Sequence, residues 1–122
     1  MTTWTQDYPA LPGSAHAAAA YADAIVGEHL PGRGGDAGKI VRGLFQAALA
    51  RSSPLSRLNL TTIFDDSPRR FLRFELVFPN DVDAPDAPLA HQIVSALADS
   101  CGETWTRRRR DRMIYAELWE HA

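Results

Sequence analysis

Two neighbouring segments in the middle of the chain alternate between apolar and polar positions. In residues 58–64 and 71–78 every second residue is apolar or threonine, beginning with Leu58 in the first segment and Leu72 in the second. A period of two residues is typical of half-buried β-strands, because successive side chains point to opposite faces of a sheet. The intervening sequence Asp-Asp-Ser-Pro favours a turn. The pattern therefore predicts an antiparallel hairpin.

Three other segments carry apolar residues at three- and four-residue spacing, which is the period of an α-helix. We expect helices over residues 14–30, 36–51 and 88–100, with Ser14 and Asp36 as the N-terminal caps of the first two. The third helix begins with a proline, which is tolerated there because its missing N–H would have no partner in a first turn.

The remaining segments complete an α+β pattern. Residues 103–107 and 113–119 are predicted to be two more strands, and Gly102 fits the left-handed position that follows a helix. Residues 1–13 are expected to form an irregular N-terminal arm with one short strand around residues 4–8. We predict a two-layer sandwich, with about three helices on one face of a mixed, mostly antiparallel sheet.

Length and composition fit one globular domain, which we place at residues 14–122. A net charge of -2 and a pI of about 6.0 argue against nucleic acid as the main partner. The single cysteine, Cys101, has no partner for a disulfide or a cysteine-based metal site, which favours the cytoplasm. The longest apolar stretch, residues 15–26, contains His16 and Asp23 and is too short to span a bilayer, so we expect no membrane association.

The C-terminal third of the chain resembles a known family. Residues 93–99 read Ile-Val-Ser-Ala-Leu-Ala-Asp, Gly102 follows, and residues 112–118 read Arg-Met-Ile-Tyr-Ala-Glu-Leu. This order is similar to the end of the anti-sigma-factor serine kinases, which belong to the histidine-kinase-like (GHKL) ATPase superfamily. Residues 43–49 resemble the family's metal-binding helix. The resemblance implies a Bergerat-type sandwich that holds Mg²⁺ and ATP between helices and sheet.

The chain departs from this family at each of its nucleotide-binding elements. Gly43 stands where the family has a catalytic acid, and Ala47 where an asparagine oxygen holds Mg²⁺, which neither a hydrogen atom nor a methyl group can replace. The adenine-binding aspartate and the phosphate-binding glycines are also missing. We therefore expect no bound cofactor and no catalysis. The positions of the degenerate pocket are Gly43, Ala47, Phe78, Pro79, Pro88, Leu89 and Ala90.

A basic run lies between the last two predicted strands. Trp105 flanks it, and arginine and tryptophan are both enriched at binding hot spots. An acidic protein surface and a merely solvated turn are both compatible with this run. The candidate partner-binding residues are Trp105, Arg107, Arg108, Arg109, Arg110 and Arg112.

These observations lead to a first functional hypothesis, a non-catalytic regulatory module with a kinase-like ATPase fold, or pseudokinase. By resemblance, its partner would be a sigma factor, an anti-sigma antagonist or a related regulator. The resemblance also implies homodimer contacts through the first helix, residues 14–30, and the neighbouring sheet edge.

Two alternatives remain at this stage. One is a divergent anti-sigma-factor serine/threonine kinase that binds Mg-ATP through replacement residues, with Asp81 or Asp83 for adenine and Glu28 or Gln46 for the metal. The other is a DNA-associated regulator that uses the turn at residues 107–112, although the net acidity argues against DNA binding as the main role.

Overall fold

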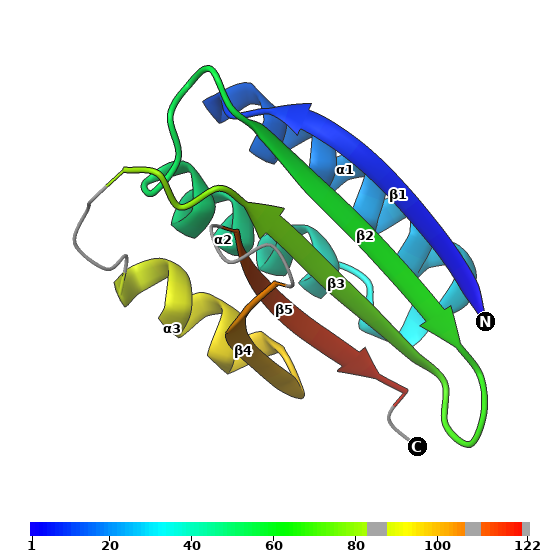
Figure 1. Ribbon diagram of the computed structural model, residues 1–122. Coiled ribbons are helices and arrows are strands. Elements are labelled where there is room, and N and C mark those ends of the chain that lie inside the picture. Colours follow the sequence, from blue (N-terminus) through cyan, green and yellow to red (C-terminus); the bar gives the residue numbers. More distant parts are fainter. Residues whose placement is uncertain (83–87, 107–110, 121–122) are drawn as a thin grey trace.

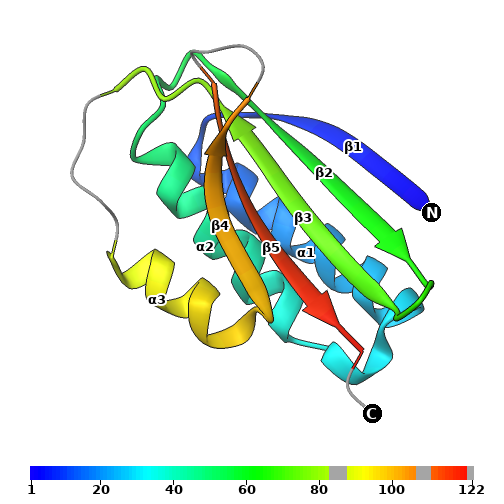
Figure 2. The same ribbon diagram turned by 60° about the horizontal axis from the view of Figure 1, so that its bottom comes forward.

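The computed structural model describes residues 1–82, 88–106 and 111–120, with the side chains of residues 88–90 outside this description. Five strands form one sheet in the order β1-β2-β3-β5-β4, and every pairing of neighbours is antiparallel. The helices cover one face of this sheet and leave the other face open (Figure 1, Figure 2). The elements are β1 (Thr2–Pro9), α1 (Pro12–His29), the 3₁₀ turn η1 (Pro31–Arg33), α2 (Asp36–Leu49), β2 (Arg57–Asp65), β3 (Phe71–Phe78), α3 (Pro88–Leu97), β4 (Ser100–Trp105) and β5 (Arg112–Trp119).

The predicted two-layer α+β sandwich is confirmed, with an antiparallel sheet in place of a mixed one. The predicted hairpin is β2 and β3, in which Asn59 faces Val77 and Asp65 faces Phe71. The alternation of apolar and polar residues in this hairpin decides which side chains are buried. The odd positions of β2 and β3 point to the open face, and the even positions point to the helices. The fully buried even positions include Leu58, Thr62, Leu72, Phe74, Leu76 and Phe78.

The expectation of an irregular N-terminal arm was wrong for most of its length. Residues Thr2–Pro9 form β1, an eight-residue edge strand paired with β2 from Thr2 opposite Phe64 to Pro9 opposite Arg57. Only Trp4, Gln6 and Tyr8 are partly buried, so the strand itself carries a weak apolar signal. The residues with which it pairs lie 48 to 62 positions further along the chain, and this long-range pairing decides the conformation of β1.

Neither predicted N-cap acts as one. Helix α1 begins at Pro12, with Leu11 at the cap position, and the Ser14 hydroxyl instead donates to the Pro9 carbonyl at 2.7 Å. Helix α2 is preceded by Gly35, whose φ of 89° explains why glycine stands there. Asp36 lies in the first turn of α2, where a negative charge is favourable.

Helices α1 and α2 approach each other closely at Gly38. An added Cβ at Gly38 would lie 2.4 Å from the Asp23 carboxylate, and the Gly38 N–H donates to the same carboxylate at 2.8 Å. Glycine therefore permits both the close packing and this hydrogen bond. Alanines of α1, including Ala18 and Ala22, are fully buried at this contact layer.

The buried Arg33 joins three distant parts of the chain at one end of the sheet. Its guanidinium donates to Asp99 at 2.9 Å, to the Leu97 carbonyl at 2.9 Å and to the Trp119 carbonyl at 3.3 Å. Asp99 in turn accepts the Trp119 N–H at 2.8 Å. The glycine-rich segment around Arg33 thus connects η1 to the end of α3 and the end of β5.

The expected left-handed conformation of Gly102 was also wrong. Gly102 lies inside β4 opposite Tyr115, and an added Cβ would lie 2.8 Å from the tyrosine oxygen. The glycine is therefore explained by this ring and not by a helix end. Among the described residues, none of the helices combines the length and the apolar character that a membrane span requires.

Candidate functional site

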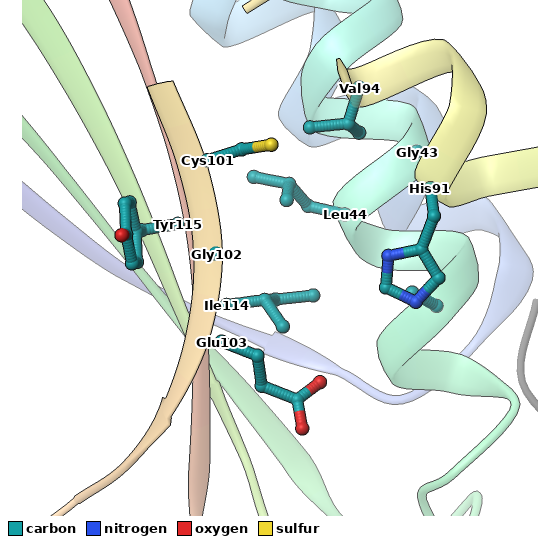
Figure 3. Close-up of a pocket in the computed structure, with 10 residues that line it drawn as sticks. Gly43, Leu44, His91, Val94, Cys101, Gly102, Glu103, Ile114 and Tyr115 are labelled. Atoms are coloured by element: carbon teal, nitrogen blue, oxygen red, sulfur yellow. The ribbon is translucent and has the colours of Figure 1, made fainter.

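A cavity of about 110 Å³ lies between the helical layer and the edge of the sheet formed by β4 and β5 (Figure 3). Helix α2 faces it from one side and α3 from another. Its walls are mostly apolar, and the Tyr115 ring points away from it, across the sheet. The described residues that line it are Gly43, Leu44, Ala47, His91, Val94, Cys101, Gly102, Glu103, Ile114 and Tyr115.

The structure brings two of the predicted pocket positions together in this cavity. Gly43 and Ala47 are one turn apart on α2, and both are buried and line the space. Phe78 is instead 1% exposed in the core, and it lines, with Pro79, a separate hollow at the end of β3. The side chains of residues 88–90, the other predicted pocket positions, lie outside the described part of the chain.

Two potentially reactive side chains also reach the cavity. His91, on α3, lines the cavity from an exposed position. Cys101 lines it as well, and its position on the edge strand β4 leaves it exposed. Its sulfur lies 3.7 Å from the Ser95 hydroxyl.

Glu103 is the carboxylate of the cavity lining, and two arginines bind it. Arg51, just after the end of α2, donates to its two oxygens at 2.6 and 3.2 Å. Arg112, at the start of β5, donates through Nε at 2.7 Å and also through Nη2. Burial alone would raise the pKa of the Glu103 carboxyl, but these hydrogen bonds and charges outweigh burial and hold the pKa below its ordinary value.

This arrangement limits the chemistry at the cavity. A carboxylate that accepts hydrogen bonds from two guanidinium groups is a poor general base, because its lone pairs are occupied and its pKa is lowered. It is equally unsuited to hold Mg²⁺, which prefers carboxylate oxygens that are available for coordination. Across residues 1–82, 88–106 and 111–120, no cluster of three histidine, cysteine, aspartate or glutamate side chains is placed to bind a metal ion.

The replacement residues that an ATP-binding alternative requires are not among the residues that line the cavity. Asp81 accepts hydrogen bonds from the Ser53 N–H at 2.8 Å and the Ser56 hydroxyl at 3.2 Å, so it stabilises the turn before β2. Gln46 is exposed on α2, and Glu28 is exposed on α1. Asp83 lies outside the described residues.

Two of the predicted partner-binding residues lie beside Glu103. Trp105, at the end of β4, is 59% exposed, and the Arg112 guanidinium lies 3.9 Å from its ring centroid. Arg112 is therefore shared between Glu103 and Trp105. Arg107, Arg108, Arg109 and Arg110 lie outside the described residues.

The sequence did not reveal the roles of Arg51 and Glu103. They are 52 residues apart along the chain, Arg51 just after the end of α2 and Glu103 within β4. A helix-end arginine and a strand glutamate carry no local signal of pairing, and only the antiparallel β4–β5 register places Glu103 near Arg112 and α2.

Comparison with known proteins adds no family assignment to this geometry. No protein-family model matches the sequence, and no curated protein matches it. The kinship to histidine-kinase-like ATPases therefore stays a prediction that rests on the C-terminal residues of the chain.

Proposed function

We propose that this chain is a non-catalytic regulatory module that uses a kinase-like ATPase fold to bind another protein. Its partner would be a sigma factor, an anti-sigma antagonist or a related regulator in the cytoplasm. The observation that carries this proposal is the cavity at Gly43 and Ala47, where the chemistry of a nucleotide site is missing.

The size of the cavity supports this view. Sites for small-molecule ligands usually enclose about 300–1,000 Å³, whereas this cavity has about 110 Å³. Its carboxylate, Glu103, is already bound by Arg51 and Arg112, and no other carboxylate is present in the described lining. A triphosphate and its metal would therefore find neither space nor ligands there.

The exposed pair of Trp105 and Arg112 supports the choice of a protein as the ligand. The Trp105 indole ring is more than half exposed, and the contact of so large an apolar surface with water costs free energy. Stacking on the Arg112 guanidinium fixes the position of the ring. Aromatic and arginine side chains in this arrangement are typical of interface hot spots. The four-arginine sequence that follows Trp105 adds the positive charge that an acidic partner surface would require.

Nucleotide binding is the first test. We expect Mg-ATP and Mg-ADP to leave the melting temperature unchanged and to give no heat in calorimetric titration. A site with a micromolar dissociation constant would instead stabilise the fold by about 4 kcal/mol at a thousandfold excess of nucleotide. Such stabilisation would favour the kinase alternative and overturn the proposal.

Partner binding is the second test. Purified sigma factors and anti-sigma antagonists from the same cell are titrated against the immobilised full chain. We expect Trp105→Ala to weaken the binding by about tenfold or more, as the loss of a hot spot does. Thr3→Ala is the matched control, because Thr3 is exposed on β1, at the edge of the sheet opposite β4. Equal loss in both variants, or no binding by any candidate, would count against the proposal.

A further inference from the structure

Among the described residues, no element covers the face of the sheet opposite the helices (Figure 2). The side chains on this face differ between β1 and β2 on one side and β3 and β5 on the other. On β1 and β2 the outward positions are mostly polar, with Thr3, Thr5, Asp7, Asn59 and Thr61 among them. On β3 and β5 the outward positions include three aromatic side chains, a valine and a methionine. An antiparallel sheet that faces water on one side normally carries polar residues on that side.

The outward positions of β3 and β5 form an ordered array, called here the β3–β5 grid. All of its members are partly exposed. The facing pairs, in order along the strands, are Phe71 with Trp119, Arg73 with Glu117, Glu75 with Tyr115, and Val77 with Met113.

The two ends of the grid are apolar, and the charges lie between them. Arg73 donates to Glu75 at 2.8 Å and to Glu117 at 3.3 Å, and its guanidinium lies 4.0 Å from the Tyr115 ring centroid. These charges are therefore paired within the molecule, which lowers the cost of covering them. At the apolar end that carries Phe71 and Trp119, the Arg69 guanidinium lies 5.5 Å from the Trp119 ring centroid.

The ends also differ in shape. A hollow of about 260 Å³ lies at the end that carries Phe71 and Trp119, and Arg69 lines it as well. The other end carries Val77 and Met113. Methionine is a long and adaptable side chain that fills irregular gaps. The hollow at one end of the grid can thus receive the side chains at the other end of the grid of a second copy.

Two copies of the sheet can stack face to face and be related by a two-fold axis that lies between them, at right angles to the strands. Under this symmetry the grid of one copy is complementary to the grid of the other. This axis places β3 over β3 with the strand direction reversed. Phe71 then lies over Val77 of the second copy, and Arg73 lies over Glu75 of the second copy. By the same operation Trp119 meets Met113 and Glu117 meets Tyr115, so large side chains meet smaller ones and Arg73 meets a carboxylate of the second copy.

The available area is sufficient for a stable pair. Under this axis the whole open face of one copy covers that of the other, the polar outward positions of β1 and β2 included. Five strands, about 4.8 Å apart and about eight residues long, cover about 600 Å² per copy, or about 1,200 Å² for two copies. Specific interfaces begin at about this size. Sheets packed face to face lie about 10 Å apart and keep their strands within about 30° of each other, which the reversed stacking allows.

We propose that the β3–β5 grid is a homodimer interface, in which a second copy of this chain stacks its open sheet face on the first. The pair would have four layers, with the helices on both outer sides. This surface shares Tyr115 with the cavity lining, but the Tyr115 ring points away from the cavity. The proposal goes beyond the regulatory function and does not depend on it.

Self-association of the full chain tests this proposal. Sedimentation velocity from micromolar to millimolar concentration should show a shift from one mass of 13.4 kDa to twice that mass. The variants Phe71→Lys and Val77→Lys each place an ammonium group against an apolar side chain of the second copy. We expect each to weaken the association roughly tenfold or more, because that charge has no partner in the covered interface.

Ala20→Lys provides the matched control, because Ala20 is exposed on α1, on the other side of the molecule. We expect this variant to associate as the unchanged chain does. Melting curves identify any variant that does not fold, and the two grid variants act at opposite ends of the grid. A 13.4 kDa monomer at every concentration would overturn the proposal. A dimer that Ala20→Lys abolishes and both grid variants leave intact would also overturn it, because such a dimer uses α1.

Discussion

The two halves of the helical layer are packed very differently. Helices α1 and α2 bury an almost continuous set of side chains against the sheet, including Val26, Ile40 and Phe45, each with no exposed surface. On α3, Val94 is the buried side chain among residues 91–97, and no residue of β4 is buried. The cavity lies at the boundary between these halves, where α2 meets α3 and β4.

This difference has a physical consequence for function. Regions with few buried apolar contacts open at a lower free energy than the core and are commonly used for binding. The α3–β4 half carries the cavity, the exposed thiol of Cys101 and the exposed ring of Trp105. The α1–α2 half supplies the rigid support, and the charged contacts of Arg33 and Arg51 attach the other half to it.

The largest expected effect concerns the core of the packed half. Phe45→Ala removes a fully buried ring that also contacts the Tyr8 ring, with 5.3 Å between centroids, and should cost about 3–5 kcal/mol of unfolding free energy. Val94→Ala, on α3, removes two methyl groups beside an existing cavity and should cost about 1–2 kcal/mol. Urea denaturation measures both, and equal losses would contradict the comparison between the halves.

A smaller effect is expected from the arginines that attach α3 and β4. Arg33→Leu removes the guanidinium that donates to Asp99 and to two main-chain carbonyls, and should cost about 3 kcal/mol. Arg51→Leu leaves Glu103 still bound by Arg112 and should cost about 1 kcal/mol. If urea denaturation showed that Arg51→Leu lowers the unfolding free energy more than Arg33→Leu does, the contact between Arg51 and Glu103 would be the stronger attachment.

The smallest expected effect is a pH dependence at Glu103. Its pKa in the folded chain lies below the ordinary value of 4.5, so the unfolded chain binds a proton first as the pH falls. The stabilising contribution is complete above pH 4.5 and is lost as the pH falls through the folded-state pKa. The stability advantage of the unchanged chain over Glu103→Gln should therefore shrink in acid.

Urea denaturation of both chains from neutral pH to below pH 4.5 measures this advantage. A difference that stays constant over the whole range would show that the bond to the arginines does not depend on the Glu103 charge.

The pattern of the sequence predicted those elements whose burial is regular. Strand β3 was predicted with its bounds, Phe71–Phe78, because its even positions are all buried and its odd positions are not. Helix α2 was predicted from its first residue, because its apolar stripe follows the helical period. Strand β1 was predicted only in part, because an edge strand with little burial carries little apolar signal.

The candidate site was predicted to a smaller extent. Gly43 and Ala47 do line one cavity, from one face of α2, and His91, which was not among the predicted pocket positions, meets them there. Phe78 does not reach it, because the same alternation that identified β3 directs that ring into the core, where Arg51 lies 4.9 Å from its centroid. Cys101 is exposed because β4 is an edge strand, which its small apolar character did not indicate.

The sequence by itself determined the class of the fold, the hairpin of β2 and β3, and the absence of side-chain oxygen atoms at positions 43 and 47. These depend on local periodicity and on the chemistry of single residues. Only the tertiary structure decided that Arg51 and Arg112 bind Glu103, that Arg33 is buried against Asp99, and that the β3–β5 grid is uncovered. Each of these depends on strand order and register, which bring together residues that are distant along the chain.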